Sequence, residues 1–343
     1  MTLRPTSRRQ RYAAQTLGLC ATLVGIALGR FAYPPLIPEM IEAGWLTPAE
    51  AAHAGAANLV GYCLGAILAL VAPRSSRRPL VVSAMGVTVL SFIACAMPWG
   101  VTWISAWRFV AGIAGAWLMV RGVSTALTAV TARERPRVSG VTFTGIGLGT
   151  LLTAGVATLL PWIGPTTAWL LMAVLAGAAT GVDIRAWLVM RPASPDSIEV
   201  GVSARRHRGW LLAPLLIIVA YAVEAIGIVP HGVFWVDFLV RERHLSQGFA
   251  ALQWWVVGIG SLVGPTVIVK IAGRTGIPFM LQACYAFTAL AVATPVITSQ
   301  PALLPRPSPV TRAHLPRSAP ITPPEPAVPA AAADHPSCLP CST

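Results

Sequence analysis

The sequence is poor in charge, and poorest in lysine, asparagine and acidic residues. Only 11% of its 343 residues are charged, and 12 Asp and Glu face 25 Lys and Arg, of which Lys270 is the one lysine. Asn58 is the one asparagine. So little charge, with a mean hydropathy of +0.68, excludes an ordinary soluble domain, in which about a quarter of the residues are charged.

Cysteine and catalytic motifs are equally sparse. Four of the six cysteines fall in apolar stretches, where a thiol acts as a small apolar group, and the other two form a lone C-x-x-C pair without zinc spacing. They are Cys20, Cys63, Cys95 and Cys284, then Cys338 and Cys341. No nucleophile elbow, Walker or zincin pattern occurs, and no His, Asp or Glu cluster has ligand spacing. We therefore expect no enzyme, no metal and no cofactor.

Nine long apolar stretches dominate what is present. Each is apolar around its whole circumference and close to the 20 or so residues that a helix needs to cross a bilayer. The predicted spans are approximately 13–33, 51–72, 79–98, 101–128, 139–161, 166–188, 210–236, 248–269 and 278–298. The sequence predicts an all-α polytopic membrane protein.

Arginine is concentrated on alternate connections between these spans. With a cytoplasmic N-terminus, 17 of the 25 basic residues lie on inner segments, and Arg241 and Arg243 alone lie on outer loops. This bias fixes the predicted orientation and removes the reason to expect a nucleic-acid partner. Tryptophans are expected at the membrane interfaces, at the outer side Trp99, Trp103, Trp162, Trp169, Trp235, Trp254 and Trp255.

The chain repeats itself weakly at an offset of 199 residues. Leu46-Thr47 corresponds to Leu245-Ser246, and Gly61 and Gly65 correspond to Gly260 and Gly264. Parallel repeats of this kind build transporters. We therefore predict a complete six-helix N-terminal half over 1–188, a basic cytoplasmic linker over 189–209 and a partial, three-helix C-terminal half over 210–298.

After about residue 298 the composition changes to proline, alanine, serine and arginine. Such a segment buries too little apolar surface to fold, so 299–343 is predicted to be disordered. The abrupt change suggests truncation or a shifted reading frame; a genuine disordered tail is the alternative.

Polar groups inside the spans are the candidate functional residues, because ionisable groups in the hydrocarbon zone face a protein interior or a water cavity. Prolines after Arg30 are expected to break the first span and free carbonyls. The substrate or coupling candidates are Arg30, Tyr33, Asn58, Tyr62, Arg108, Arg121, Tyr221, Glu224 and His231. The last three, with Gly227, share one helical face.

Structural roles compete with these functional ones. Arg30, Arg121 and Glu224 are equally suited to buried ion pairs that hold the halves together. Arg108 near an outer end is suited to extending toward the boundary. Asp237 is expected to be solvated. Glu224, near the centre of its span, is either a proton site or one member of an ion pair. Gly145, Gly147, Gly149 and Gly155 suggest helix packing or a hinge.

Several of these residues resemble the major facilitator superfamily. Arg74-Ser75-Ser76-Arg77-Arg78 stands where that family keeps a conserved cytoplasmic loop, without its glycine and aspartate. Arg108-x-x-x-Gly112 resembles the fourth-helix motif, whose arginine is often linked to proton coupling. Segments 29–33, 55–62 and 231–237 resemble the bacterial YbfB/YjiJ branch. The resemblance covers about 13–298 and implies a major-facilitator-type helical bundle.

The predicted function is that of a permease of the bacterial inner membrane, N-terminus inside, which moves a small solute by alternating access. Coupling to protons through Glu224 with Arg30, Arg108 or Arg121 is a hypothesis. Its partners are expected to be the lipid bilayer, a small solute and protons, and we expect a monomer. The alternatives are a transport-inactive truncated fragment and a non-transporting membrane sensor or assembly protein.

Overall fold

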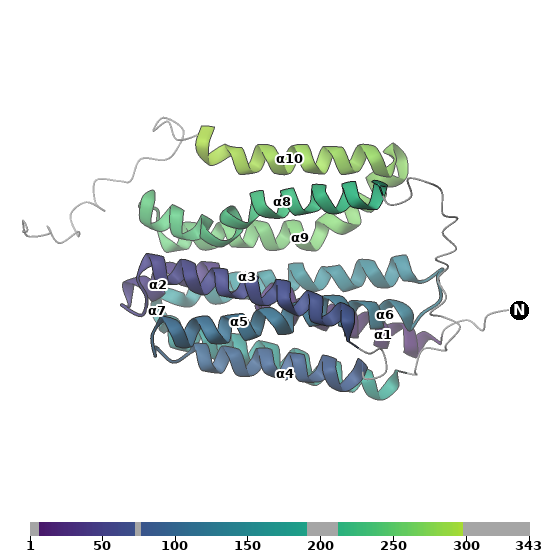
Figure 1. The fold of residues 1–343 in the computed structure, drawn as a ribbon, viewed down its shortest axis with the longest axis horizontal. Helices are drawn as coiled ribbons and strands as arrows, with labels where there is room; N and C mark the ends of the chain where they lie inside the picture. The colour runs from purple at the N-terminus through teal and green to yellow at the C-terminus, as the bar shows by residue number, and fades with distance from the viewer. Residues whose placement is uncertain (1–6, 73–76, 191–211, 298–343) are drawn as a thin grey trace, which may run out of the picture. The chain divides into compact units, whose positions relative to one another are not determined.

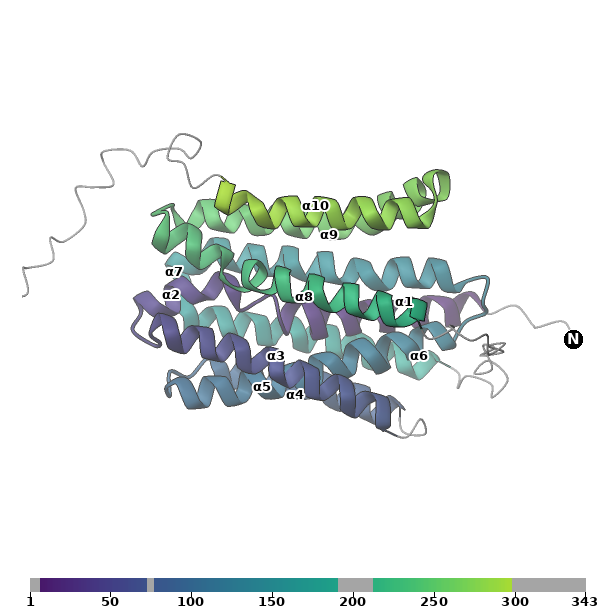
Figure 2. The ribbon, with the colours of Figure 1, turned by 45° about the horizontal axis from the view of Figure 1, so that its top comes forward.

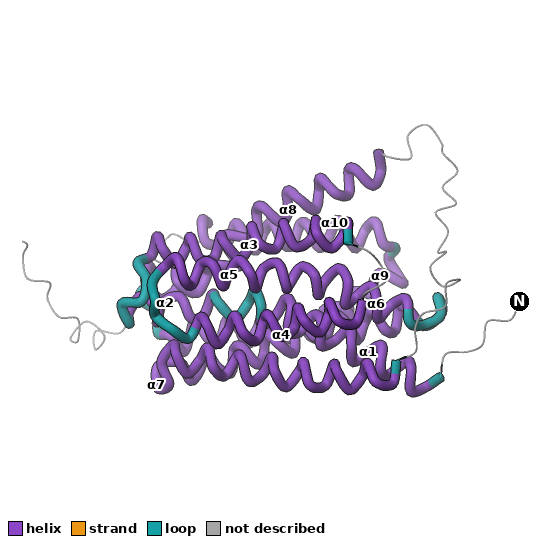
Figure 3. The backbone as a smooth tube through the Cα atoms, turned by 60° about the horizontal axis from the view of Figure 1, so that its bottom comes forward, coloured by secondary structure: helices purple, strands orange, loops and turns teal. Residues whose placement is uncertain are grey.

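The computed structural model describes residues 7–72, 77–190 and 212–297, and every regular element in these ranges is helical (Figures 1 and 3). Nearly all of the expected linker 189–209, and the whole of 299–343, lie outside them. The longer helices are α1 (Arg8–Thr22), α3 (Pro48–Val71), α4 (Arg77–Cys95), α5 (Val101–Trp117), α7 (Arg135–Val189), α8 (Leu212–Asp237), α9 (Gln247–Thr275) and α10 (Ile277–Ile297).

Short segments complete these helices. A π-helical segment, Leu23–Leu28, continues α1, and a second, Leu118–Gly122, leads from α5 into α6 (Val123–Thr128). A 3-10 turn, Pro34–Leu36, precedes α2 (Ile37–Glu42), and a third π-helical segment, Phe238–Glu242, follows α8. Within the described ranges, seven helical stretches are long and apolar enough to cross a membrane, and Pro278–Ala293 is a shorter apolar one.

Helix α7 contains two of the predicted spans, 139–161 and 166–188. Its 55 residues would extend about 80 Å if straight, far more than a bilayer. Gly164 breaks it, with a positive φ of 68° that favours glycine, between Pro161 and Pro165. Before the break, Thr142 contacts Gly18 of α1; after the break, Asp183 lies within electrostatic reach of Cys20, also on α1. The two segments of α7 therefore lie beside the same part of α1. The chain therefore turns back at Gly164, where the sequence predicted a connection (Figure 2).

The surface of these helices is apolar. Only 33% of the apolar 18-residue stretch within α3 is buried. Large apolar side chains are 75% exposed at Leu70, Val71, Ile226 and Phe287. In water such patches cause association, whereas lipid solvates them. The exposed residues therefore agree with the sequence prediction that these helices lie in a bilayer.

Helices α3 and α5 pack at backbone distance. A β-carbon on Gly61 would collide with the carbonyl oxygen of Phe109, and one on Gly112 with that of Asn58. The absence of a side chain at these two glycines therefore permits the close approach of α3 and α5. The glycines of span five also serve packing: Gly145 lies against Leu19, and Gly149 against Ala27 and Leu23.

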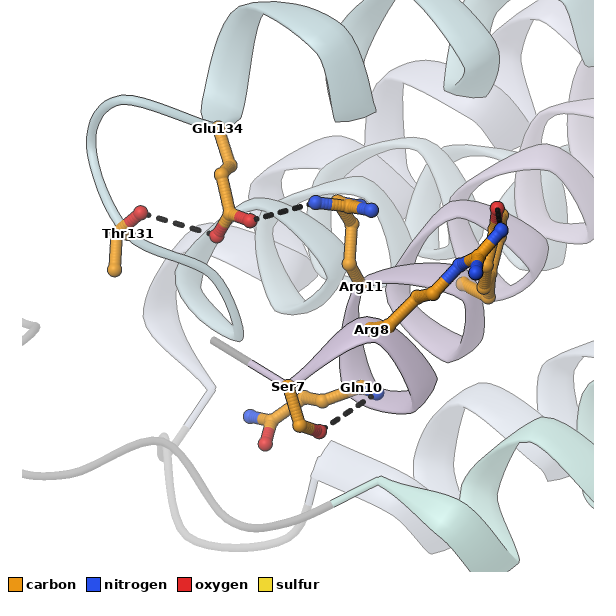
Figure 4. Close-up of polar contacts among 7 residues, drawn as sticks. Ser7, Arg8, Gln10, Arg11, Thr131 and Glu134 are labelled. Carbon is orange, nitrogen blue, oxygen red and sulfur yellow. Dashed lines mark hydrogen bonds and ion pairs between the residues drawn. The ribbon is translucent and has the colours of Figure 1, made fainter. Parts of the chain in front are cut away.

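One end of the bundle collects basic side chains. Arg11 forms an ion pair with Glu134 at 3.2 Å (Figure 4). Gln10 donates to the carbonyl of Ala129 at 2.9 Å. Thr131 donates to the same Glu134 at 3.0 Å. These bonds join the start of α1 to the turn between α6 and α7. We call this end, with Arg8, Arg11, Arg133 and Arg135, the basic end, and the other the opposite end.

The 199-residue offset is visible in the structure. Helix α3 begins at Pro48 and α9 at Gln247, which differ by that offset. The side chain of Thr47 accepts from the Glu50 amide, and that of Ser246 from the Phe249 amide. The two helices therefore begin with the same kind of cap at corresponding positions.

Helices α8 and α9 contact the preceding helices at named points. Gln247 donates to the carbonyl of Pro35 at 3.1 Å, and Trp255 donates to the Thr158 hydroxyl at 3.1 Å. Gly147 lies against the backbone of Leu262. An open, largely apolar groove of about 470 Å³ between α7 and α9 is lined by Phe143, Ile146, Val257, Gly260, Ser261, Gly264, Pro265 and Ile268.

Replacement of Gly61 by leucine should destabilise the protein, because the new side chain has to push α3 away from the α5 backbone. We expect a loss of about 1–3 kcal/mol in unfolding free energy, seen as a lower thermal midpoint in detergent. Gly86→Leu is the control, since nothing lies within 4 Å of a β-carbon there. Equal midpoints for the two variants would contradict the packing described.

Candidate functional site around Arg108

The first crossing is interrupted near the opposite end. Its helix widens into the π-helical segment Leu23–Leu28, loses regular structure after Gly29, and resumes at the 3-10 turn that begins with Pro34. Proline lacks an amide hydrogen, and a proline ring prevents an ordinary helix through residues 30–33. The prediction that these prolines break the span is confirmed.

Arg108 of α5 is directed at this interruption. Its Nη1 donates to the carbonyl of Gly29 at 2.9 Å, and the side chain is buried, with 2% of its surface exposed. It lies eight residues, or about 12 Å, from Gly100, which precedes α5 at the opposite end. Arg108 therefore does not extend to the membrane boundary; it binds a carbonyl that the broken helix leaves free.

Aromatic rings surround the guanidinium. The Arg108 Cζ lies 4.7 Å from the centroid of the Tyr33 ring and 6.0 Å from that of Trp169. Tyr33 and Trp169 are stacked with centroids 6.3 Å apart, and Phe92 adjoins Trp169 at 5.9 Å. The Tyr33 hydroxyl donates to the carbonyl of Ala51 at 2.8 Å, which fixes the ring in place. Cation–π attraction partly replaces the water that the guanidinium has lost.

Asn58 and Tyr62 approach from α3. The Asn58 amide donates to the backbone carbonyl of Arg108 at 2.8 Å, and its side chain is buried. Tyr62, one turn further along, is partly buried. Asn58 therefore fixes the position of Arg108 on α5 rather than contacting its guanidinium.

Arg30 is a second cation, within electrostatic reach of Arg108. It follows Gly29 directly, so its backbone lies one residue from the carbonyl that Arg108 binds. Its side chain is partly buried, with the guanidinium 5.8 Å from the Phe31 ring, and its positive charge repels that of Arg108. Of the candidates, the structure thus gathers Arg30, Tyr33, Asn58 and Arg108.

Arg121 lies elsewhere. Its guanidinium donates to the carbonyl of Ala72, where α3 ends, and lies 5.8 Å from the Trp117 ring. This position is toward the basic end of the bundle. Arg121 therefore joins the end of α3 to the π-helical segment after α5, and it is not part of the Arg108 site.

Glu224 of α8 is partly exposed, and neither ion pair in the described part of the chain includes it. The hypothesis that Glu224 pairs with an arginine is not supported by the structure. Tyr221 and His231 lie on the same helix, as predicted, but their side chains are outside the described residues.

The expectation for Asp237 was wrong. Its side chain is only 19% exposed, and its carboxylate forms an ion pair with Arg241 at 3.5 Å. The two residues are one helical turn apart, which is why the pair forms. On the same helix, Val233 packs against Gly55, where an added β-carbon would lie 3.2 Å from it.

Two residues of interest were missed by sequence analysis. Trp169, expected at an interface, is completely buried beside Arg108, and Trp254 is also buried, whereas Trp99 and Trp162 are exposed. Asp183 is fully buried on α7, and its carboxylate interacts with the side chain of Trp187 one turn further along the helix. No spacing or motif distinguishes these residues in the sequence.

In the ranges that the structure covers, no three His, Cys, Asp or Glu side chains are grouped to hold a metal ion. The chemistry available at the Arg108 site is therefore that of two guanidinium groups beside aromatic rings. Such groups are suited to binding a ligand.

Comparison with protein families gives one match, over residues 22–308, to the family described as "Uncharacterised MFS-type transporter YbfB". The matched residues end within the Pro-rich segment and include the whole Arg108 site. A search of curated proteins found no match.

Solved transporter structures share the fold. The D-xylose–proton symporter aligns with a TM-score of 0.50 and 16% identity, covering 78% of this chain and 69% of that one. A bacterial homolog of the human lysosomal transporter Spinster aligns in two inward-facing structures. The unoccupied one gives a TM-score of 0.51 with 18% identity, 78% of this chain and 64% of that one. The occupied one gives 0.50 with 17% identity, 77% and 61%. The chain thus spans less than two thirds of the Spinster homolog.

Two substitutions of Tyr33 should separate the contribution of its hydroxyl to stability from that of its ring. Tyr33→Phe removes only the hydrogen bond to Ala51 and should cost about 1 kcal/mol of unfolding free energy. Tyr33→Leu also removes the ring that faces Arg108 and should cost about 1–2 kcal/mol more. Thermal unfolding in detergent measures both. Tyr12→Leu, at an exposed tyrosine, is the control. Equal losses for Tyr33→Phe and Tyr33→Leu would show that the ring contributes nothing.

Proposed function

Because this chain belongs to the YbfB family of MFS-type transporters, we propose that it is a permease that moves a small solute across the bacterial inner membrane by alternating access. It is a multi-pass membrane protein with the fold of known transporters.

The observation that carries the proposal is the interrupted first crossing with Arg108 bound to it. Non-helical backbone at membrane depth is stable only where protein or a cavity satisfies its polar groups. Transporters use such broken helices to form their binding sites. Here the freed Gly29 carbonyl, the guanidinium and the rings of Tyr33 and Trp169 meet inside the bundle.

We propose that the basic end faces the cytoplasm. The exposed residues Arg8, Arg9, Arg133 and Arg137 belong to it, and positively charged segments are retained on the cytoplasmic side. The N-terminus is then inside, as the sequence predicts.

Two alternative functions make predictions that differ from those of the permease. A transport-inactive fragment would insert but carry no solute, because its bundle would lack helices needed to enclose a path. A sensor or assembly protein would likewise carry none, and its function would depend on a partner. Proton coupling through Glu224 stays a prediction, since the described residues give this carboxylate no arginine partner.

Solute flux from a complex mixture tests the proposal, because it does not depend on the choice of one substrate. Proteoliposomes are loaded with a bacterial metabolite extract, and the retained solutes are followed by mass spectrometry. At least one solute should leave faster than from protein-free vesicles. Arg108→Gln should slow that flux by about tenfold or more, because a buried charged hydrogen bond and the site's charge are lost.

Arg185→Gln is the matched control, since Arg185 is exposed at the end of α7 and should leave the flux unchanged. If every solute is retained equally with and without protein, the permease proposal fails and the inactive fragment is favoured.

Cysteine labelling tests the orientation. Ala43 and Ala132 are both exposed, Ala43 after α2 at the opposite end and Ala132 at the basic end. In a cysteine-free background, a membrane-impermeant maleimide added to spheroplasts should label Ala43→Cys but not Ala132→Cys. After permeabilisation both should react. Labelling of Ala132→Cys alone before permeabilisation would reverse the proposed orientation.

A further inference from the structure

The Arg108 site carries positive charge that no acidic residue neutralises in the described part of the chain. The two ion pairs there are Arg11 with Glu134 and Arg241 with Asp237. Asp237 of α8 lies within electrostatic reach of Tyr33, but it already forms an ion pair with Arg241. Arg30 and Arg108 are thus two cations beside one interrupted helix.

The hydrogen bonding of Arg108 is also incomplete. A guanidinium has five N–H donors, and Nη1 uses one on the Gly29 carbonyl. Its Nε is buried and has no hydrogen-bond partner among the described residues. A buried charged group with an unused donor is costly, and a carbonyl and two aromatic rings supply no formal negative charge. A ligand that brings an acceptor and a negative charge would remove both costs.

We propose that Arg108 and Arg30 together bind the carboxylate of the transported solute, so that the permease carries a small organic monocarboxylate. This inference rests on the proposed transport function and names its substrate class. A carboxylate matches the planar edge of a guanidinium. Because Gly29 engages Nη1, the edge formed by Nε and Nη2 remains for one carboxylate group.

The rest of the site indicates what the carboxylate is attached to. Phe31, Tyr33 and Trp169 bring aromatic rings close to the two guanidinium groups. These rings favour a compact apolar or aromatic body over a polyhydroxylated one. Tyr33 is 1% exposed and covers Arg108, so the solute reaches the guanidinium only after the Tyr33 hydroxyl releases the Ala51 carbonyl and the ring moves aside.

Ligand-dependent thermal unfolding of the full chain in detergent tests the substrate class directly. The probes are acetate, lactate and benzoate, each paired with its neutral amide (acetamide, lactamide and benzamide), with inorganic phosphate as a further anion, all at constant ionic strength. At least one carboxylate should raise the unfolding midpoint, while its amide does not. A ligand at 100 times its Kd stabilises by about 2.7 kcal/mol, which is readily measured.

Four variants locate the binding. Arg108→Gln should abolish the carboxylate shift, and Arg108→Lys should retain part of it, because the charge stays but the planar fork is lost. Arg30→Gln should raise the half-saturating concentration by about tenfold, as expected for one lost charged contact. Arg185→Gln should behave like the wild type. If Arg108→Gln does not fold, Arg108→Lys and Arg30→Gln still decide the result.

The inference is overturned if no carboxylate shifts the midpoint, if the amides act equally, if phosphate alone acts, or if Arg108→Gln, Arg108→Lys and Arg30→Gln all respond to the carboxylate as the wild type does. Binding is measured here without flux, so the two proposals can fail separately. Flux of a neutral solute without carboxylate binding would reject the substrate class and keep the permease. Carboxylate binding without any flux would reject the permease and keep the carboxylate-binding site.

Discussion

The hydrogen bond from Arg108 to the Gly29 carbonyl is the interaction on which the rest of the structure depends. Lipid offers no water to a broken helix, so the interruption after Gly29 is stable only because a donor from another helix reaches it. The same guanidinium faces Tyr33 and Trp169, and Asn58 binds the Arg108 backbone. One residue therefore joins the first crossing, α3, α5 and the second segment of α7.

The sequence predicts the helices well, because the length of an apolar stretch is a local property that the bilayer thickness sets. The turn at Gly164 falls in the predicted connection between 161 and 166, and the helix break falls at the predicted prolines. The offset repeat correctly relates the starts of α3 and α9. Close packing at Gly61 was also predictable, since only a small side chain permits that approach.

Contacts between distant segments were not predictable in this way. Trp169 is as consistent with a membrane interface as Trp162 is, yet it is buried because α7 turns back and places it against Tyr33 and Phe92. Asp237 was expected in solvent but binds Arg241. An arginine–glutamate pair was a reasonable expectation for Glu224, but neither ion pair among the described residues includes it. Helical periodicity shows which face of a helix a residue lies on, but not which residue of another helix it contacts.

Arginines outnumber acidic residues in this chain, so several arginine side chains donate to backbone carbonyls instead of carboxylates. Arg108 donates to Gly29 after a π-helical segment, Arg121 to Ala72 at the end of α3, and Arg135 to Leu127 in the last turn of α6. Each acceptor lies at a helix C-terminus, where carbonyls lack intrahelical partners and the helix dipole favours a cation. These carbonyls satisfy hydrogen bonds but carry only partial charge. Where such a cation is buried, as Arg108 is, its formal charge stays available to an anion from outside the protein.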